Sequence, residues 1–109
     1  MWRYDTRTEL LTIVYDAALD PGMQLSGVDN VTAARSGDLF VAEDGGNMEL
    51  VMITPDGVAA PLLRIVGQSS SELAGPAFDP YGRRLYVSSQ RGGGNGITYE
   101  ITGPFRRSA

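Results

Sequence analysis

Oxygen-bearing side chains that could hold a divalent cation stand at three points of the sequence. Asp29 and Asn30 are neighbours, Glu43 and Asp44 follow an apolar run, and Glu72 precedes another. Hard cations such as calcium take about six to eight oxygen ligands from carboxylates, amides and backbone carbonyls. The pattern therefore predicts part of a calcium site.

Each of these residues also has an ordinary structural explanation. Asp and Asn cap their own backbone in turns, and from the sequence alone this is the favoured explanation for Asp29 and Asn30. Neighbouring residues on a strand point to opposite faces, so only one of Glu43 and Asp44 can face a site, and both could be solvated carboxylates at a strand end. Arg91 could bind phosphate through its planar guanidinium group, although an exposed loop arginine is the commoner case.

The composition excludes several other kinds of chemistry. The chain has no Cys and no His, which excludes zinc ribbons, thiol nucleophiles and Ser-His-Asp triads. Nine basic residues against 13 acidic ones give a net charge of -4, and without a basic stripe nucleic-acid binding is disfavoured. No apolar run of about 18 residues predicts a membrane span, and no export signal is recognisable.

The elements that would position the candidate ligands form a repeat. Residues 29–43 align with residues 74–88, so that Gly37 matches Gly82, and each copy is followed by glycines and a further strand-like run. The spacing of roughly 45 to 48 residues is typical of one four-stranded propeller blade per copy.

The repeat also favours one candidate metal ligand over the others. Glu72 lies just before its copy of the repeat, at the position that corresponds to Val28 and Asp29 at the start of the other copy. Two blades would therefore each present an acidic group at the same depth in the ring. This makes Glu72 the best single metal candidate. Two carboxylates could bind a divalent cation only weakly.

Short β-prone runs separated by Gly and Pro turns predict about nine strands and no helix. The expected strands are 2–5, 10–15, 30–34, 38–43, 49–54, 57–65, 75–79, 84–88 and 97–102. The predicted fold class is all-β, with propeller blades of four-stranded antiparallel sheets.

We predict about two blades in a single partial β-propeller domain over residues 1–109. Residues 1–20 would supply outer strands of one blade, 28–66 a complete blade, and 72–105 a last, partial blade. A propeller needs about four to eight blades to close, so the ring is incomplete unless other blades or copies of the chain join it.

Five pieces of the sequence carry a family resemblance: 28–31, 37–44, 53–57, 71–82 and 96–105. Together they resemble the C-terminal part of bacterial PhoX-type alkaline phosphatases. The resemblance implies a periplasmic or secreted propeller enzyme that hydrolyses phosphate monoesters, with calcium and iron held mainly by carboxylates. It also favours Glu43 over Asp44 as a ligand, and gives the expected metal set Glu72, Asp29, Asn30 and Glu43, with Arg91 for phosphate.

The family's N-terminal blades, export signal and iron-binding thiol have no counterpart here. We therefore expect the C-terminal segment of a metal-dependent phosphatase-like propeller that is inactive alone, with calcium as its cofactor and iron only in the intact family. Its partners would be the missing blades or copies of itself, and its substrate a small phosphorylated molecule. Two alternatives stay open: a self-assembling non-enzymatic propeller module that binds a ligand or partner, and a lactonase-like calcium propeller.

Overall fold

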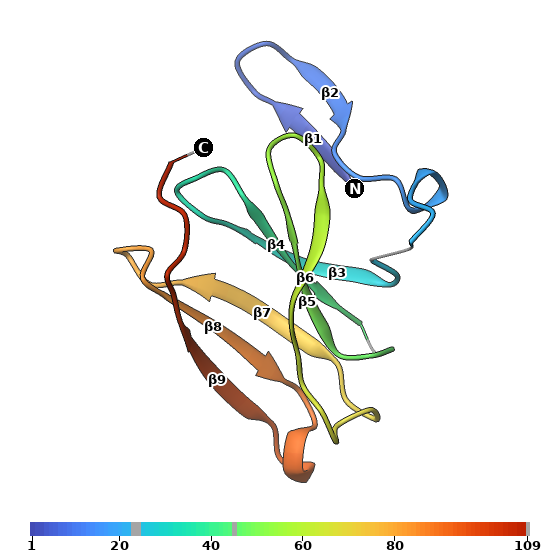
Figure 1. The fold of residues 1–109 in the computed structure, drawn as a ribbon, viewed down its shortest axis with the longest axis vertical. Coiled ribbons are helices and arrows are strands. Elements are labelled where there is room, and N and C mark those ends of the chain that lie inside the picture. The colour runs from blue at the N-terminus through green and yellow to red at the C-terminus, as the bar shows by residue number, and fades with distance from the viewer. Residues whose placement is uncertain (23–24, 45, 109) are drawn as a thin grey trace.

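A computed structural model describes residues 1–22, 25–44 and 46–108 of the chain. The described residues form antiparallel sheets of two, four and three strands, which do not close a ring (Figure 1). No described helix has the length and apolar character needed to cross a lipid bilayer. The elements are β1 (Trp2–Asp5), β2 (Leu10–Ile13), η1 (Ala17–Leu19), β3 (Val28–Ala33), β4 (Leu39–Glu43), β5 (Glu49–Ile53), β6 (Ala59–Arg64), β7 (Leu73–Phe78), β8 (Arg84–Ser89), η2 (Gly92–Gly94) and β9 (Ile97–Thr102).

The structure confirms the predicted all-β fold and its blade-like sheets. Strands β3, β4, β5 and β6 form one four-stranded sheet, and β7, β8 and β9 form the second copy of the repeat with three strands. The turn between β3 and β4 shows why the repeat carries a glycine. Gly37 has a φ of +88° and donates its N–H to the Ala34 carbonyl at 3.0 Å, a conformation that side chains with a Cβ strain to adopt.

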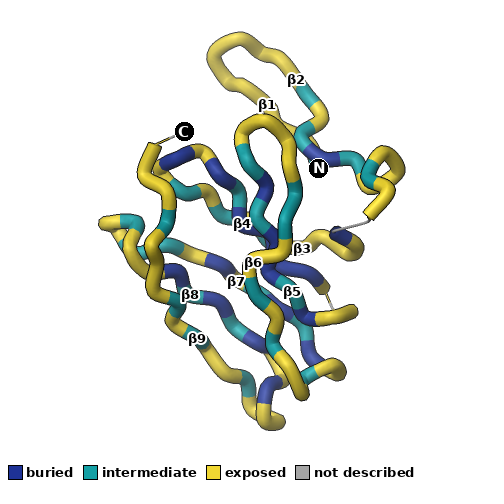
Figure 2. The backbone as a smooth tube through the Cα atoms, in the orientation of Figure 1, coloured by how far each residue is buried: buried dark blue, intermediate teal, exposed yellow. Residues whose placement is uncertain are grey.

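Strand alternation gives the four-stranded sheet two apolar faces. Phe40, Ala42 and Leu50 pack toward the three-stranded sheet, where Leu85 and Val87 meet them. All five are buried, and the buried segments lie where the two sheets adjoin (Figure 2). Each large side chain contributes about 1.5–3 kcal/mol of burial free energy, so this contact holds the two blades together.

The opposite face of the four-stranded sheet is covered by the segment that follows β2. Val41, Val51 and Ile53 pack there against Tyr15 and Leu25, and all five are buried. The segment therefore closes the second core of the molecule.

The hairpin of β1 and β2 lies apart from both cores. Its register pairs Trp2 with Ile13 and Tyr4 with Leu11, which puts four apolar side chains on one face. Their exposed fractions are 63, 53, 57 and 59% respectively, so this face is largely exposed.

Residues 103–106 run back from β9 to the first blade, and we call them the strap. Phe105 lies edge-on to Phe40 and Phe78, with ring centroids 5.8 and 5.1 Å away. Phe40 and Phe78 contact each other in the same way at 5.2 Å. Edge-to-face aromatic pairs add about 0.5–1.5 kcal/mol beyond burial, so the strap fastens one blade to the other.

The strap ends in an ion pair with a buried carboxylate. Asp38 is 1% exposed; Arg106 donates from Nε to its Oδ2 at 3.0 Å and from Nη2 to its Oδ1. The Ser36 hydroxyl also donates to Asp38 Oδ2 at 2.6 Å. The hydrogen bonds from Arg106 hold the pKa of Asp38 below its ordinary value, against the effect of burial.

Candidate functional site

The predicted site residues lie at one end of the two blades, opposite the strap. Val28 at the start of β3 pairs with Glu43 at the end of β4, and Leu73 at the start of β7 pairs with Ser89 at the end of β8. Strands β3 and β7 also contact each other across the blade interface. Antiparallel pairing therefore brings the candidate ligands of both repeats to the same edge.

Glu72 interacts with the carboxyl of Asp44. A hydrogen bond with the Asp44 carboxyl is the largest cause of a raised pKa at Glu72, followed by burial and by the charge of Asp44. Two neighbouring carboxylates repel each other, and a proton or a cation between them would relieve that repulsion. The structure thus places Asp44, rather than Glu43, beside the best candidate ligand.

Arg91 lies beside this carboxyl pair and partly neutralises it. Its Nη2 is 3.6 Å from Glu72 Oε2, with exposed side-chain fractions of 53 and 20%, and it works to lower the pKa of Glu72. The Arg91 Nε donates to the Ser70 carbonyl at 3.0 Å. Two of the guanidinium nitrogens are therefore engaged with the protein, which leaves Nη1 as the nitrogen free of these contacts for a phosphate.

The backbone around Arg91 is fixed by buried hydroxyls. The Arg91 N–H donates to Ser71 Oγ at 2.9 Å, and Ser89 Oγ donates to the same oxygen at 2.8 Å. Ser71 and Ser89 are 2% and 0% exposed. Sequence reasoning did not single out these serines, because a serine in a turn gives no signal of the strand end that it contacts.

Glu43 ends β4 with its side chain buried. Its Oε1 accepts a hydrogen bond from the Ser26 N–H at 3.1 Å. Its Oε2 is buried without a hydrogen-bond partner among the described residues. Burial raises the pKa of Glu43, which the amides of Ser26 and Glu49 partly offset. An unsatisfied buried carboxylate oxygen is costly unless a proton or a cation meets it.

Asn30 joins the inner strands of the two blades. Its Oδ1 accepts a hydrogen bond from the Gly75 N–H at 2.8 Å, so the amide oxygen proposed as a ligand is already bound to backbone. Asp29 lies in an irregularity of β3, where the register shifts between Val28 and Asn30, and its side chain is exposed. The β7 register shifts at the corresponding place, between Ala74 and Ala77.

Two acidic side chains at this end are of the donor type that calcium prefers. Over residues 1–22, 25–44 and 46–108, no three acidic side chains come together closely enough to hold a metal ion. Glu72 and Asp44 are adjacent carboxylates, a donor type that suits calcium, but calcium takes about six to eight oxygens. The residues present fit a calcium ion as partial ligands, and the remaining oxygens would come from elsewhere.

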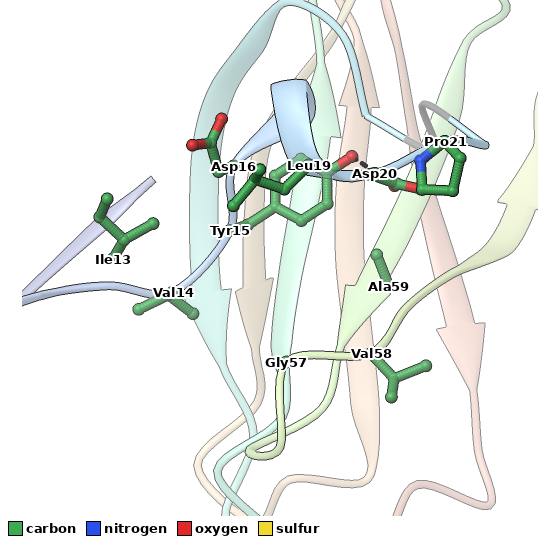
Figure 3. A pocket seen from close by; sticks show the side chains of 10 residues that line it. All are labelled: Ile13, Val14, Tyr15, Asp16, Leu19, Asp20, Pro21, Gly57, Val58 and Ala59. Atoms are coloured by element: carbon green, nitrogen blue, oxygen red, sulfur yellow. Dashed lines mark hydrogen bonds between the residues drawn. The ribbon is translucent and has the colours of Figure 1, made fainter.

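A separate pocket of about 550 Å³ lies between the segment after β2 and the turn before β6 (Figure 3). Tyr15 lies across it, donating its hydroxyl to Asp20 Oδ2 at 2.7 Å and accepting from the Leu25 N–H at 3.2 Å. Burial raises the pKa of Tyr15. Sequence reasoning missed this pocket because its walls come from segments far apart in the chain, and none of the candidate ligands lines it.

Comparison with known proteins gives one match. The family model described as alkaline phosphatase PhoX matches residues 6–93, which is most of the chain. No curated protein and no solved structure matches. The matched range includes β3 and β7, which are the first strands of the two blades. It also includes Glu43, Asp44, Glu72 and Arg91. The chain belongs to the alkaline phosphatase PhoX family.

Proposed function

We propose that this chain is the C-terminal segment of a metal-dependent, phosphatase-like β-propeller and that it contributes carboxylate ligands to a calcium site completed by other blades. The observation that carries this proposal is the Glu72–Asp44 carboxyl pair beside Arg91, in a chain of a phosphatase family. A calcium ion between the carboxyls would replace their mutual repulsion with attraction.

Glu43 adds a second reason to expect a cation near this end. Its buried Oε2 lacks a hydrogen-bond partner among the described residues, although it belongs to a residue that is only 4% exposed. Either a proton or a positive ligand would satisfy that oxygen. Asp29 and Asn30 would then act mainly as turn and interblade residues, since Asn30 already bonds Gly75.

The proposed activity of the intact propeller is hydrolysis of phosphate monoesters, with the metal polarising the phosphoryl oxygen. This segment alone should not hydrolyse such esters, because its described residues supply only part of a ligand set. The family membership favours a periplasmic or secreted location, and iron would belong to the intact protein.

A calcium titration followed by thermal unfolding tests the proposal. We expect millimolar calcium to raise the melting temperature of the full chain by about 5 °C, as weak binding to the folded state predicts. The variant Glu72→Gln keeps the side-chain shape and should abolish that rise. Glu9→Gln, in the exposed β1–β2 turn, is the matched control and should keep it. A full calcium response in Glu72→Gln would contradict the assignment.

The same protein samples test the claim about activity. With calcium present, hydrolysis of para-nitrophenyl phosphate should not exceed that of a buffer blank. Turnover above the blank that disappears in Glu72→Gln would show that two blades suffice for catalysis, and would overturn this part of the proposal.

A further inference from the structure

The two copies of the repeat differ at their outer edge. In the first copy β5 pairs with β4 on one side and β6 on the other, whereas in the second copy β9 pairs only with β8 among the described residues (Figure 1). The edge of β9 (Ile97–Thr102) therefore presents unpaired backbone N–H and C=O groups, which form a template for another strand. The first copy shows that the fold accepts an antiparallel strand at this position.

The side chains next to this edge define which strand would fit. Tyr99 and Ile101 belong to the partly buried rim of the interblade core. A groove of about 430 Å³, lined also by Leu63 and Val66, lies between β9 and the end of β6. Glu100, between them, points to the other face, which is exposed. An added strand should therefore carry two apolar residues with a cationic residue between them.

The polar face of β9 has room for a further positive charge. Glu100 accepts a hydrogen bond from the Tyr86 hydroxyl at 2.9 Å, and Arg84 Nε lies 3.7 Å from its other oxygen. Both side chains of that ion pair are largely exposed, at 57 and 43%. A cation on a neighbouring strand would contact this carboxylate directly.

Strand β1 has the required pattern. Trp2 and Tyr4 share the exposed apolar face of the hairpin, and Arg3 lies between them on the opposite face. Only β2 pairs with β1 among the described residues, so β1 also has a free edge. Figure 1 shows β1 near one end of the long axis and β9 toward the other, and the two strands belong to different sheets that do not pair within one molecule.

We propose that β9 receives β1 of a second copy of this chain as an antiparallel fourth strand. With the second copy's Arg3 opposite Glu100, its Trp2 lies opposite Ile101 and its Tyr4 opposite Tyr99, so apolar and charged faces both match. Each copy then has one donor edge and one acceptor edge, and the contact is head-to-tail. The inference rests on strand pairing alone and does not depend on the proposed metal site.

A charge-reversal series tests the register. Light scattering over a range of concentrations should show the full chain associating, and Arg3→Glu should raise the dissociation constant about tenfold, because a cross-strand attraction becomes a repulsion. Arg7→Glu makes the same charge change in the exposed turn of the hairpin and should leave the constant within about twofold of wild type.

The double variant Arg3→Glu with Glu100→Arg should restore association to within about threefold of wild type. Hydrogen exchange should also slow at residues 97–102 as wild-type concentration rises, and circular dichroism should show that every variant keeps its strands. A monomer at all concentrations overturns the proposal. So does equal weakening by Arg3→Glu and Arg7→Glu, or failure of the reversed pair to restore association.

Discussion

Acidic groups at the two ends of the blades have different hydrogen-bond environments, and their pKa values shift in opposite directions. At the strap end, Asp38 is buried with both oxygens bonded, and its pKa is lowered. At the other end, Glu43 is buried with one oxygen unbonded among the described residues, and Glu72 lies beside the Asp44 carboxyl. The pKa values of Glu43 and Glu72 are raised.

The two ends therefore differ in whether the chain supplies partners for its own acidic oxygens. The cation of Arg106 and the hydroxyl of Ser36 satisfy Asp38 within the chain. Arg91 is the corresponding cation at the other end, but it faces two carboxyls and has other hydrogen bonds to make. The strap end therefore serves stability, and the cation site that we propose lies at the opposite end.

The largest expected effect comes from breaking the aromatic contact at the strap end. Phe40→Ala removes a fully buried ring from between Phe78 and Phe105 and should lower the free energy of unfolding by about 3–5 kcal/mol. Urea unfolding measures the loss. Tyr81→Ala, at an aromatic residue that is 69% exposed, is the control and should cost less than about 0.5 kcal/mol. A loss below about 1 kcal/mol in Phe40→Ala would show that the strap end is not the stabilising one.

A smaller effect should follow from removing the cation at the same end. Arg106→Ala leaves the Asp38 carboxylate buried without its ionic partner and should destabilise the chain by about 2–3 kcal/mol. The neighbouring Arg107→Ala removes the same charge and should change urea unfolding by less than about 0.5 kcal/mol. Equal losses in the two variants would contradict a specific role for the ion pair.

The smallest effect is a pH dependence of opposite sign at the two ends. The raised pKa of Glu43 means that its protonated form stabilises the fold fully below its ordinary value of 4.5, and that this stability is lost as pH rises through the folded value. Asp38 instead contributes stability above its ordinary value of 3.8, which is lost as pH falls through its folded value.

Urea unfolding between pH 4 and pH 8 measures the Glu43 contribution. The wild-type free energy of unfolding should fall as pH rises in this window, and Glu43→Gln should flatten the slope while Glu9→Gln leaves it unchanged. Glu72 adds to the same slope, so the variant reduces it without removing it. A wild-type slope in Glu43→Gln would place its carboxylate in a solvated environment.

Most of the fold follows from local sequence patterns. The alternation of apolar residues and the turn glycines predict all nine strands to within about two residues of their bounds. Gly37 and Gly82 mark equivalent turns, and both have positive φ, at +88° and +67°. The repeat alignment also predicts that β3 corresponds to β7 and that β4 corresponds to β8, because each copy of the repeat encodes its own hairpin.

The site was only partly predictable, because its contacts cross between sheets. Strand alternation predicts that Glu43 and Asp44 diverge, but only the packing of one blade on the other shows that Asp44 meets Glu72. The bond from Gly75 to Asn30 depends on the same packing. The strap has no local signal at all, since Arg106 and Asp38 are 68 residues apart.

Because of that separation, the contacts of the strap can form only late in translation. Phe40 and Asp38 leave the ribosome well before their partners Phe105 and Arg106 have been translated. The blades can pair earlier, but they lock only after residue 106 has emerged, since domains on a nascent chain fold as their segments become available. A translation product that stops before residue 105 would display an unpaired carboxylate and an uncovered Phe78 ring, features by which chaperones and proteases would distinguish it from a chain that carries the strap.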